Sequence, residues 1–186
     1  SSSVALGSFL LNGSSQYGSF ARPVQDDFTL VVWFRTTQQY SHSGSTTAGN
    51  YWQGAGLIGG DGSSYQNDFG MSMSMGKVVF GVGKTGATTD YSVLSPNTYR
   101  DDKWHLAVGT RIKSTGAIEL YMDGASVASR STSSVDSLTY KATLEMGRED
   151  GSRYFNGRIA VIAAYNVVWT ASDVEGYYEL RKPRFA

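Results

Sequence analysis

The 186-residue sequence contains no cysteine. This excludes a disulfide framework, a thiolate metal site and a cysteine nucleophile. It also has no excess charge, because 16 Lys and Arg residues balance 16 Asp and Glu residues. A nucleic-acid-binding protein needs a basic surface, and electrostatic attachment to a membrane needs a basic segment. No apolar run approaches the roughly 18 residues of a membrane span. We therefore expect neither nucleic acid binding nor membrane insertion.

Charged residues are scarce, at 17% of the chain, against about 25% in ordinary domains. Ser, Thr, Gly and Asn supply the polar surface instead, a composition common on extracellular β-proteins. We expect an extracellular, cell-surface or virion location. The length fits one domain over residues 1–186. No signal peptide stands at Ser1, so the chain is either a mature form or an excised piece of a larger multidomain or oligomeric assembly.

Alternation with a period of two dominates the chain and predicts β-strands. In residues 69–75, Phe69, Met71 and Met73 point one way and Gly or Ser points the other. The run from Leu30 to Phe34 is apolar on both faces, which predicts a central strand covered on both sides. The same reasoning predicts further strands at residues 4–11, 16–20, 78–82, 103–111, 117–123, 125–129, 142–147 and 156–166.

One helix is predicted over residues 170–182. Thr170 is a good N-cap, and Asp173 three residues later resembles a capping box. Arg181 and Lys182 suit the negative end of the helix dipole, which we favour over an anion-binding role. About a dozen short strands and one C-terminal helix predict an all-β fold, an antiparallel sandwich of two sheets.

A series of motifs gives the sequence a family resemblance. In chain order they are LLNGSSQYGSF (10–20), DFTLVVWFRT (27–36), LIGGDG (57–62), WHLAVGT (104–110), IELYMDGASVAS (118–129), EMGRE (145–149), FNGRIAVIAAYN (155–166) and TASDVE (170–175). In this order the sequence resembles the laminin-G-like, concanavalin-A-like lectin/glucanase jelly-roll family. The resemblance implies two stacked antiparallel sheets of about six or seven strands each. Members are mostly binding modules for glycans or proteins, and some relatives cleave polysaccharides, so the site must decide the function.

The family often holds a structural calcium ion, and this chain departs from that pattern. The resemblance places acidic ligands where this sequence has Asn12, Gln16 and Ala160. Calcium prefers several carboxylate or carbonyl oxygens. We therefore predict that this calcium is absent or weak, and we expect no cofactor. A second calcium site in the acidic loops described below stays open.

Catalysis is not expected. Glycosidases need two carboxyl groups beside the scissile bond, and enzymes on this fold commonly place them in an alternating acidic pattern that this sequence lacks. Glu119 with Asp123, and Glu145 with Glu149, are four apart, which along one strand means about 13 Å. His105 is interpreted as a structural histidine, and no Gly-x-Ser-x-Gly nucleophile elbow is present. A serine triad is not thereby excluded.

Three methionines alternate along one predicted strand, at Met71, Met73 and Met75. Thioether sulfur selects copper(I), so a copper site is one reading. The other is that the methionines fill the core as flexible apolar side chains. We favour the core.

Two Gly-rich acidic segments connect strands, at residues 59–68 and 147–155. They are either solvated turns capped by Asx side chains or loops that contact sugar hydroxyls or calcium. Their polar side chains are Asp61, Asn67, Asp68, Glu149, Asp150 and Arg153.

The longest predicted loop, residues 38–56, combines Ser, Thr, Gly and Asn with Tyr40, His42, Tyr51 and Trp52. Sugar binding needs a flat aromatic face together with polar groups for the hydroxyls, and long loops in compact domains are often functional. The alternative is that Tyr51 and Trp52 begin the next strand and pack against a sheet edge.

The sequence thus predicts a non-catalytic binding module for carbohydrate or adhesion, with a glycan or a surface protein as partner. Two alternatives remain: a structural or protein-binding module of a larger extracellular or virion protein, and a polysaccharide-cleaving enzyme. No metal ligands are predicted. The predicted ligand-binding residues are Tyr40, His42, Tyr51, Trp52, Asp61, Tyr65, Asp150, Arg153 and Tyr154.

Overall fold

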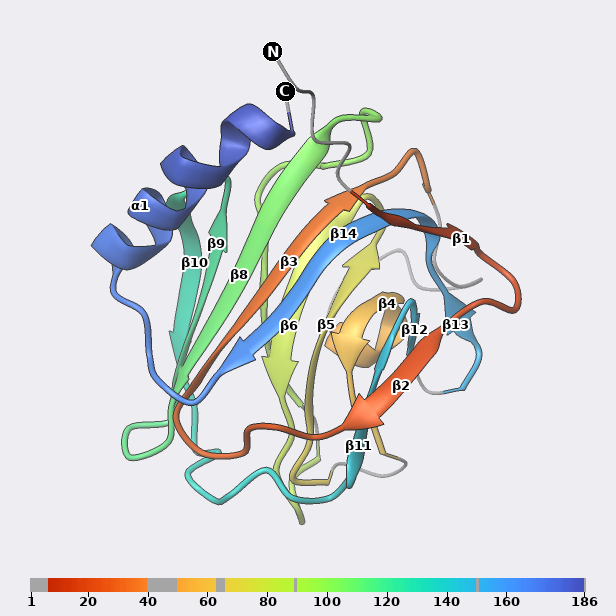
Figure 1. Cartoon of the computed structure of the whole chain (residues 1–186). Coiled ribbons are helices and arrows are strands. Elements are labelled where there is room, and N and C mark those ends of the chain that lie inside the picture. The colour runs from red at the N-terminus through yellow and green to blue at the C-terminus, as the bar shows by residue number, and fades with distance from the viewer. Residues whose placement is uncertain (1–6, 40–49, 63–65, 89, 150, 186) are drawn as a thin grey trace.

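The computed structural model describes residues 7–39, 50–62, 66–88, 90–149 and 151–185. Two six-stranded antiparallel sheets face each other (Figure 1). Sheet A contains, in spatial order, β1 (Phe9–Asn12), β14 (Asn156–Tyr165), β3 (Phe28–Arg35), β8 (Trp104–Ile112), β9 (Ala117–Met122) and β10 (Ala125–Ser131). Sheet B contains β2 (Gly18–Ala21), β11 (Thr143–Met146), β4 (Ala55–Gly59), β5 (Phe69–Ser74), β6 (Lys77–Val82) and β7 (Tyr91–Leu94). The predicted jelly-roll sandwich is confirmed.

Most strands lie where the alternation predicted them, and β3 is central in sheet A between β14 and β8, as expected. Four strands were not predicted: β4, β7, and the two-residue strands β12 (Arg148–Glu149) and β13 (Arg153–Tyr154), which form a small hairpin. Strand β4 shows no alternation of apolar and polar residues because all of its residues are buried. The other three strands are too short for a period of two to show. In the described residues, the predicted strand at 4–11 begins at Phe9.

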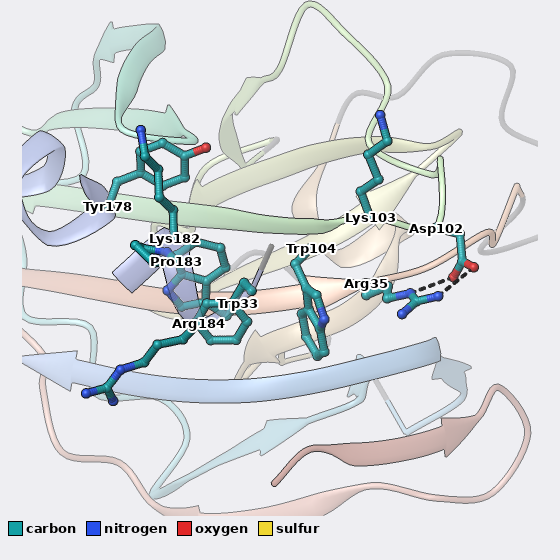
Figure 2. Close-up of a pocket in the computed structure, with 10 residues that line it drawn as sticks. Trp33, Arg35, Asp102, Lys103, Trp104, Tyr178, Lys182, Pro183 and Arg184 are labelled. Carbon is teal, nitrogen blue, oxygen red and sulfur yellow. Dashed lines mark hydrogen bonds and ion pairs between the residues drawn. The ribbon is translucent and has the colours of Figure 1, made fainter. Parts of the chain in front are cut away.

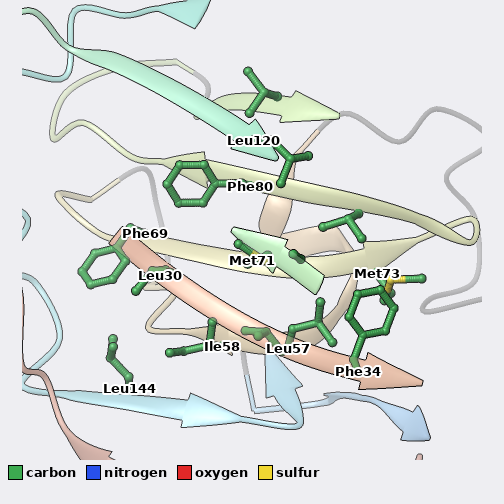
Figure 3. Packing of buried hydrophobic residues seen from close by; sticks show 14 of the residues in the cluster. Leu30, Phe34, Leu57, Ile58, Phe69, Met71, Met73, Phe80, Leu120 and Leu144 are labelled. Atoms are coloured by element: carbon green, nitrogen blue, oxygen red, sulfur yellow. The ribbon is translucent and has the colours of Figure 1, made fainter. Parts of the chain in front are cut away.

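The core fills the space between the sheets with apolar side chains from both (Figure 3). Met71 and Met73 of β5 are buried there among Leu30 and Phe80, so the interpretation of the methionines as core residues fits the structure for these two. Met75 instead occupies the β5–β6 turn, at a φ of 54°. The other face of β5 is also covered, since Ser72 is fully buried.

The predicted helix is confirmed as α1 (Ala171–Arg181), which packs on the outer face of sheet A (Figure 1). Its capping box is formed: the Asp173 backbone N–H donates to the Thr170 hydroxyl, and the Thr170 N–H donates to the Asp173 carboxylate. Val174 is its buried anchor, in contact with the cluster around Trp33. None of the described helices has the length or apolar character to cross a membrane.

His105 is held by two carboxylates. Its Nδ1 lies 2.8 Å from Asp123 and its Nε2 lies 2.9 Å from Asp101. Burial by itself lowers the pKa of His105, but the hydrogen bonds to the two carboxylates outweigh it and raise the pKa above its usual value. Both ring nitrogens therefore serve to tie the segment before β8 to the β9–β10 turn. This fits the interpretation of His105 as a structural histidine.

Arg111 at the end of β8 is fully buried and binds only backbone among the described residues. Its two terminal nitrogens donate to four carbonyl oxygens at 2.7–3.2 Å, those of Gln25, Asp26, Ser134 and Asp136. One guanidinium thus fixes two loops that are more than 100 residues apart in the chain to the same end of the sandwich.

We predict that Arg111→Met lowers the free energy of unfolding by about 3 kcal/mol or more, because several carbonyls lose their donors in a place that water reaches poorly. Urea denaturation at pH 7 measures the change. Arg130→Met, on the exposed face of β10, serves as the control and should cost less than about 1 kcal/mol. An equally small loss in Arg111→Met would show that the two loops do not depend on this side chain.

Candidate functional site on the outer face of sheet B

The outer face of sheet B is built from small residues, and another segment packs directly on it. A Cβ atom at Gly70 or Gly81 would come within 2.8 Å of the Tyr51 ring. Because both positions lack a side chain, the 3₁₀ turn η1 (Tyr51–Gln53) can press its first residue flat on the sheet. Ser72 donates a hydrogen bond to the Tyr51 carbonyl, which fixes the turn to β5.

Tyr51 is completely buried, so its predicted role as an exposed stacking face is wrong. Its hydroxyl instead donates to the carboxylate of Asp68 at 2.6 Å and lies 3.4 Å from that of Asp61. The polar loop composition suggested exposure, but the room for the ring comes from glycines elsewhere in the sequence. The alternative reading, that Tyr51 begins the next strand and packs against a sheet edge, is right about the packing only: Tyr51 lies in η1 before β4 and packs on the face of sheet B.

Four acidic residues gather around the Tyr51 hydroxyl: Asp61, Asp68, Asp90 and Glu149. Burial raises the pKa of Asp68 to about 6, although hydrogen bonds from Tyr51 and the Gly62 backbone oppose the rise. Burial and then the charge of Asp68 raise the pKa of Asp90 to about 7. Burial and the charge of Asp61 raise the pKa of Glu149 well above its usual range. The pKa values of these three carboxyl groups therefore all lie above their ordinary values.

Trp52 and Arg153 complete this cluster. The Arg153 guanidinium carbon lies 5.1 Å from the centroid of the Trp52 ring, a cation–π distance. The Trp52 side chain also hydrogen-bonds the Asp90 carboxylate, which opposes the rise of the Asp90 pKa. Trp52 is half-buried and Arg153 is buried. Trp52 thus keeps some of its ring at the surface while its polar edge faces inward.

A polar pocket of about 320 Å³ opens beside the cluster. Side chains of both charges line it, and the buried Glu149 contributes a carboxylate oxygen, Oε2, that has no hydrogen-bond partner among the described residues. We call it the polar pocket. Its lining residues are Gly59, Gly60, Asp61, Lys141, Thr143, Glu145, Arg148, Glu149 and Gly151.

Two exposed tyrosines flank the polar pocket, each next to one of its cations. The Arg148 guanidinium carbon lies 3.5 Å from the centroid of the Tyr17 ring, and Lys141 Nζ lies 5.6 Å from that of Tyr140. Tyr17 is 45% exposed and Tyr140 is 44% exposed. Arg148 is itself held by Glu145 through two hydrogen bonds. Each of these two partly exposed rings therefore lies next to a cation that lines the pocket.

The structure brings together four of the predicted ligand-binding residues, Tyr51, Trp52, Asp61 and Arg153. Tyr154 lies at the Tyr17 side, where its hydroxyl accepts a weak hydrogen bond from Arg148 at 3.4 Å. The other four, Tyr40, His42, Tyr65 and Asp150, lie outside the described residues.

Sequence reasoning missed five residues of the polar pocket and its rim: Tyr17, Tyr140, Lys141, Glu145 and Arg148. It named Glu149 in an acidic loop but did not include it among the predicted ligand-binding residues. The expectation that Glu145 and Glu149 lie about 13 Å apart assumed that both belong to one strand, and this assumption was wrong. Gly147, at a φ of 77°, ends β11, and Glu149 belongs to β12. Both side chains line the same pocket. The signal in the sequence was Gly147 itself, since an isolated glycine in a strand often marks such a break.

The residues at the family's calcium position do not fit that ion. The side-chain oxygen of Asn12 already accepts three backbone N–H groups at 3.0–3.2 Å, those of Ser14, Ser15 and Gln16. Ala160 brings no oxygen from its side chain. Within the described ranges, no three His, Asp or Glu side chains are grouped so that they could hold a metal ion.

Residues 12–175 match the model of a family described as the concanavalin A-like lectin/glucanases superfamily. The chain belongs to this superfamily. None of the curated proteins matches the sequence. The concanavalin A-like fold is also that of the solved structures it resembles, and each of these is too distant in sequence to indicate more than the fold.

The receptor binding domain of botulinum neurotoxin D matches with a TM-score of 0.69 at 13% identity, over 94% of this chain and 44% of that chain. A structure of botulinum neurotoxin type C matches with a TM-score of 0.68 at 15% identity, over 93% and 42%. A heptameric SAP-like pentraxin from Limulus polyphemus matches with a TM-score of 0.64 at 10% identity, over 90% and 79%. The chain therefore spans less than half of the toxin chains it resembles.

We predict that Asp90→Asn stabilises the protein at pH 8 but not at pH 4.5. The folded-state pKa of about 7 lies above the ordinary 3.8, so the folded state binds the proton more tightly and stability falls as pH rises between these values. The amide removes this loss, and we expect a gain of at least about 1 kcal/mol at pH 8. Urea denaturation at both pH values measures it.

Two features control this experiment. Because the pKa of His105 is raised, its contribution to the stability of the fold also falls as pH rises. This contribution is the same in both proteins and cancels when their stabilities are subtracted. Glu175→Gln changes an exposed carboxylate on α1 and should show no such gain. If the difference in stability between the variant and the parent is the same at both pH values, burial does not raise the pKa of Asp90.

We also predict that calcium has little effect on folding. Millimolar calcium, or its removal with a chelator, should change the melting temperature by less than about 1 °C, because a bound ion would stabilise by several kcal/mol at high saturation. Differential scanning calorimetry measures the shift. A clear rise with calcium would contradict the prediction, and its persistence in Asn12→Ala would then place the ion away from the family's usual position.

Proposed function

We propose that this chain is a non-catalytic carbohydrate-binding module and that the polar pocket is its binding site. The observation that carries the proposal is the pairing of charged groups with exposed aromatic rings at one place. A sugar presents C–H groups on one face and hydroxyls around its edge, and a lectin-like site must satisfy both. Tyr17 and Tyr140 offer the rings, and Asp61, Lys141 and Glu145 offer hydrogen-bond partners.

Fixed polar groups favour this reading. Arg148 is locked between Glu145 and the Tyr17 ring, so little conformational entropy is lost when it binds a hydroxyl. The volume of about 320 Å³ suits one sugar ring and leaves the rest of a chain in solvent. Glu149 Oε2 would accept a hydrogen bond from a sugar hydroxyl if the sugar ring reached the bottom of the pocket.

The structural neighbours support a binding module in general terms. Cell entry of botulinum neurotoxin type C is dependent upon interaction with two ganglioside molecules, and another neurotoxin binding domain is in complex with rat synaptotagmin II. Because this chain spans 42% of those chains, the ligands serve only as examples of what such proteins bind. We propose an extracellular or particle-surface location on the same grounds, with adhesion as the role.

A second candidate function is protein binding. An apolar groove of about 460 Å³ lies between β14 and β2, and Phe9 at its side is 62% exposed. Exposed apolar surface of this kind is common at protein interfaces. A third reading, polysaccharide cleavage, draws on the carboxyl groups of Asp61, Glu145 and Glu149 in one pocket. Release of reducing sugars from a polysaccharide panel would favour it.

We predict that the purified chain binds glycans on an array, and that Tyr17→Ala and Tyr140→Ala each weaken the binding about tenfold, which equals about 1.4 kcal/mol. The loss follows from removing a ring beside the pocket. Tyr165→Ala removes a tyrosine of 36% exposure from sheet A and serves as the matched control. Titration calorimetry with the best array glycan measures the affinities, and melting curves confirm folding.

A blank array would count against carbohydrate binding and in favour of the protein-binding candidate. Equal losses in all three tyrosine variants would show that the polar pocket is not the binding site.

A further inference from the structure

A second pocket lies on the opposite side of the sandwich, on the outer face of sheet A. It has a volume of about 670 Å³ and lies between the end of α1 and the start of β8 (Figure 2). We call it the aromatic pocket. Its lining residues are Trp33, Arg35, Asp102, Lys103, Trp104, Tyr178, Lys182, Pro183, Arg184 and Phe185.

Aromatic rings form the base of this pocket. The Phe185 ring stacks on Trp33 at 4.0 Å between centroids, with 9° between planes, and lies 5.3 Å from Trp104. Trp33 is almost fully buried, yet its indole N–H has no acceptor among the described residues. Trp104 is only half-buried, and its ring stands between Trp33 and Arg35 (Figure 2). The pocket thus presents an accessible indole face.

Cations surround the rings. Four of the lining residues are basic and one is acidic. Arg35 forms a two-bond ion pair with Asp102 at 2.8–2.9 Å, and this planar pair lies at the surface beside Trp104 (Figure 2). Lys103 is 78% exposed and lies 3.8 Å from Asp101. Arg184 has no hydrogen-bond or ion-pair partner within the described residues. The positive charges of Lys103 and Arg184 extend toward different sides of the pocket (Figure 2).

We propose that the aromatic pocket binds an acidic oligosaccharide, a chain of sugar rings that carry carboxylate or sulfate groups. Trp104 would stack against one ring. The Arg35–Asp102 pair would bind its hydroxyls, because it combines donors and acceptors in one plane. Lys103 and Arg184 would contact acidic groups on neighbouring rings. This site is separate from the polar pocket and does not rest on the function proposed for it.

The arrangement favours this ligand over a simple anion or a neutral sugar. A single phosphate or sulfate would leave the indole face unused and would meet only one of the separated cations. A neutral sugar would leave Arg184 without a partner. An acidic saccharide uses all of these groups together.

Titration calorimetry tests the proposal with defined probes at 150 mM salt: a galacturonate hexamer, a chondroitin sulfate hexasaccharide and neutral cellohexaose. We expect binding of at least one acidic probe, at least about tenfold tighter than cellohexaose. Lys103→Ala and Arg184→Ala should each weaken it about threefold or more, since each removes one charge contact. Arg181→Ala, which removes a cation of α1 outside the pocket lining, is the matched control and should change affinity less than twofold.

The Trp104 contact is tested by Trp104→Leu, with near-ultraviolet circular dichroism to show that the fold is kept. If this variant does not fold, the two charge variants still decide, because their side chains are exposed. Tyr17→Ala should leave the binding of the acidic probe unchanged, which separates this site from the polar pocket. The proposal fails if the parent binds no acidic probe at millimolar concentration. It also fails if Arg181→Ala loses as much affinity as Arg184→Ala, or if poly-glutamate binds as tightly as the sugars.

Discussion

The absence of side chains at Gly70 and Gly81 is the constraint on which the candidate site depends. It brings the Tyr51 ring into contact with the backbone of β5 and β6. Gly56 has the same role on the neighbouring strand, where a Cβ would lie 2.2 Å from the Arg148 carbonyl oxygen. The η1 turn and the β12–β13 hairpin therefore cover the outer face of sheet B directly. Without this close approach, neither the acidic cluster nor the polar pocket would exist.

Close covering of a sheet by polar segments has an electrostatic consequence. Asp68, Asp90 and Glu149 are removed from water together, and their pKa values rise because burial and mutual repulsion favour the neutral forms. The Tyr51 hydroxyl and backbone N–H groups compensate only partly for the lost water. The site is thus less stable than an apolar one would be. Such strain is common where a protein keeps polar groups ready for a ligand.

The architecture was predictable because it depends on local patterns. Alternation places β5 and β6, a run that is apolar on both faces places β3, and the capping residues Thr170 and Asp173 place α1. The site was only partly predictable, since it depends on contacts between distant segments. The composition of the loop that contains Tyr51 and Trp52 drew attention to both residues. The burial of Tyr51, however, depends on glycines that lie 19 and 30 residues further along the chain. The polar pocket joins Asp61 to Lys141 and Glu149, and no pattern within one segment reports such a meeting.

The last strand of sheet A has a property that bears on behaviour at high concentration. The pairing of β10 with β9 shifts register between Ser126 and Ala128, which is a β-bulge, and its outer residues are Ser, Ala and Arg130. A bulge and a charge on an edge strand prevent another chain from adding to the sheet. Self-association into extended β-fibrils through this edge of sheet A is therefore disfavoured.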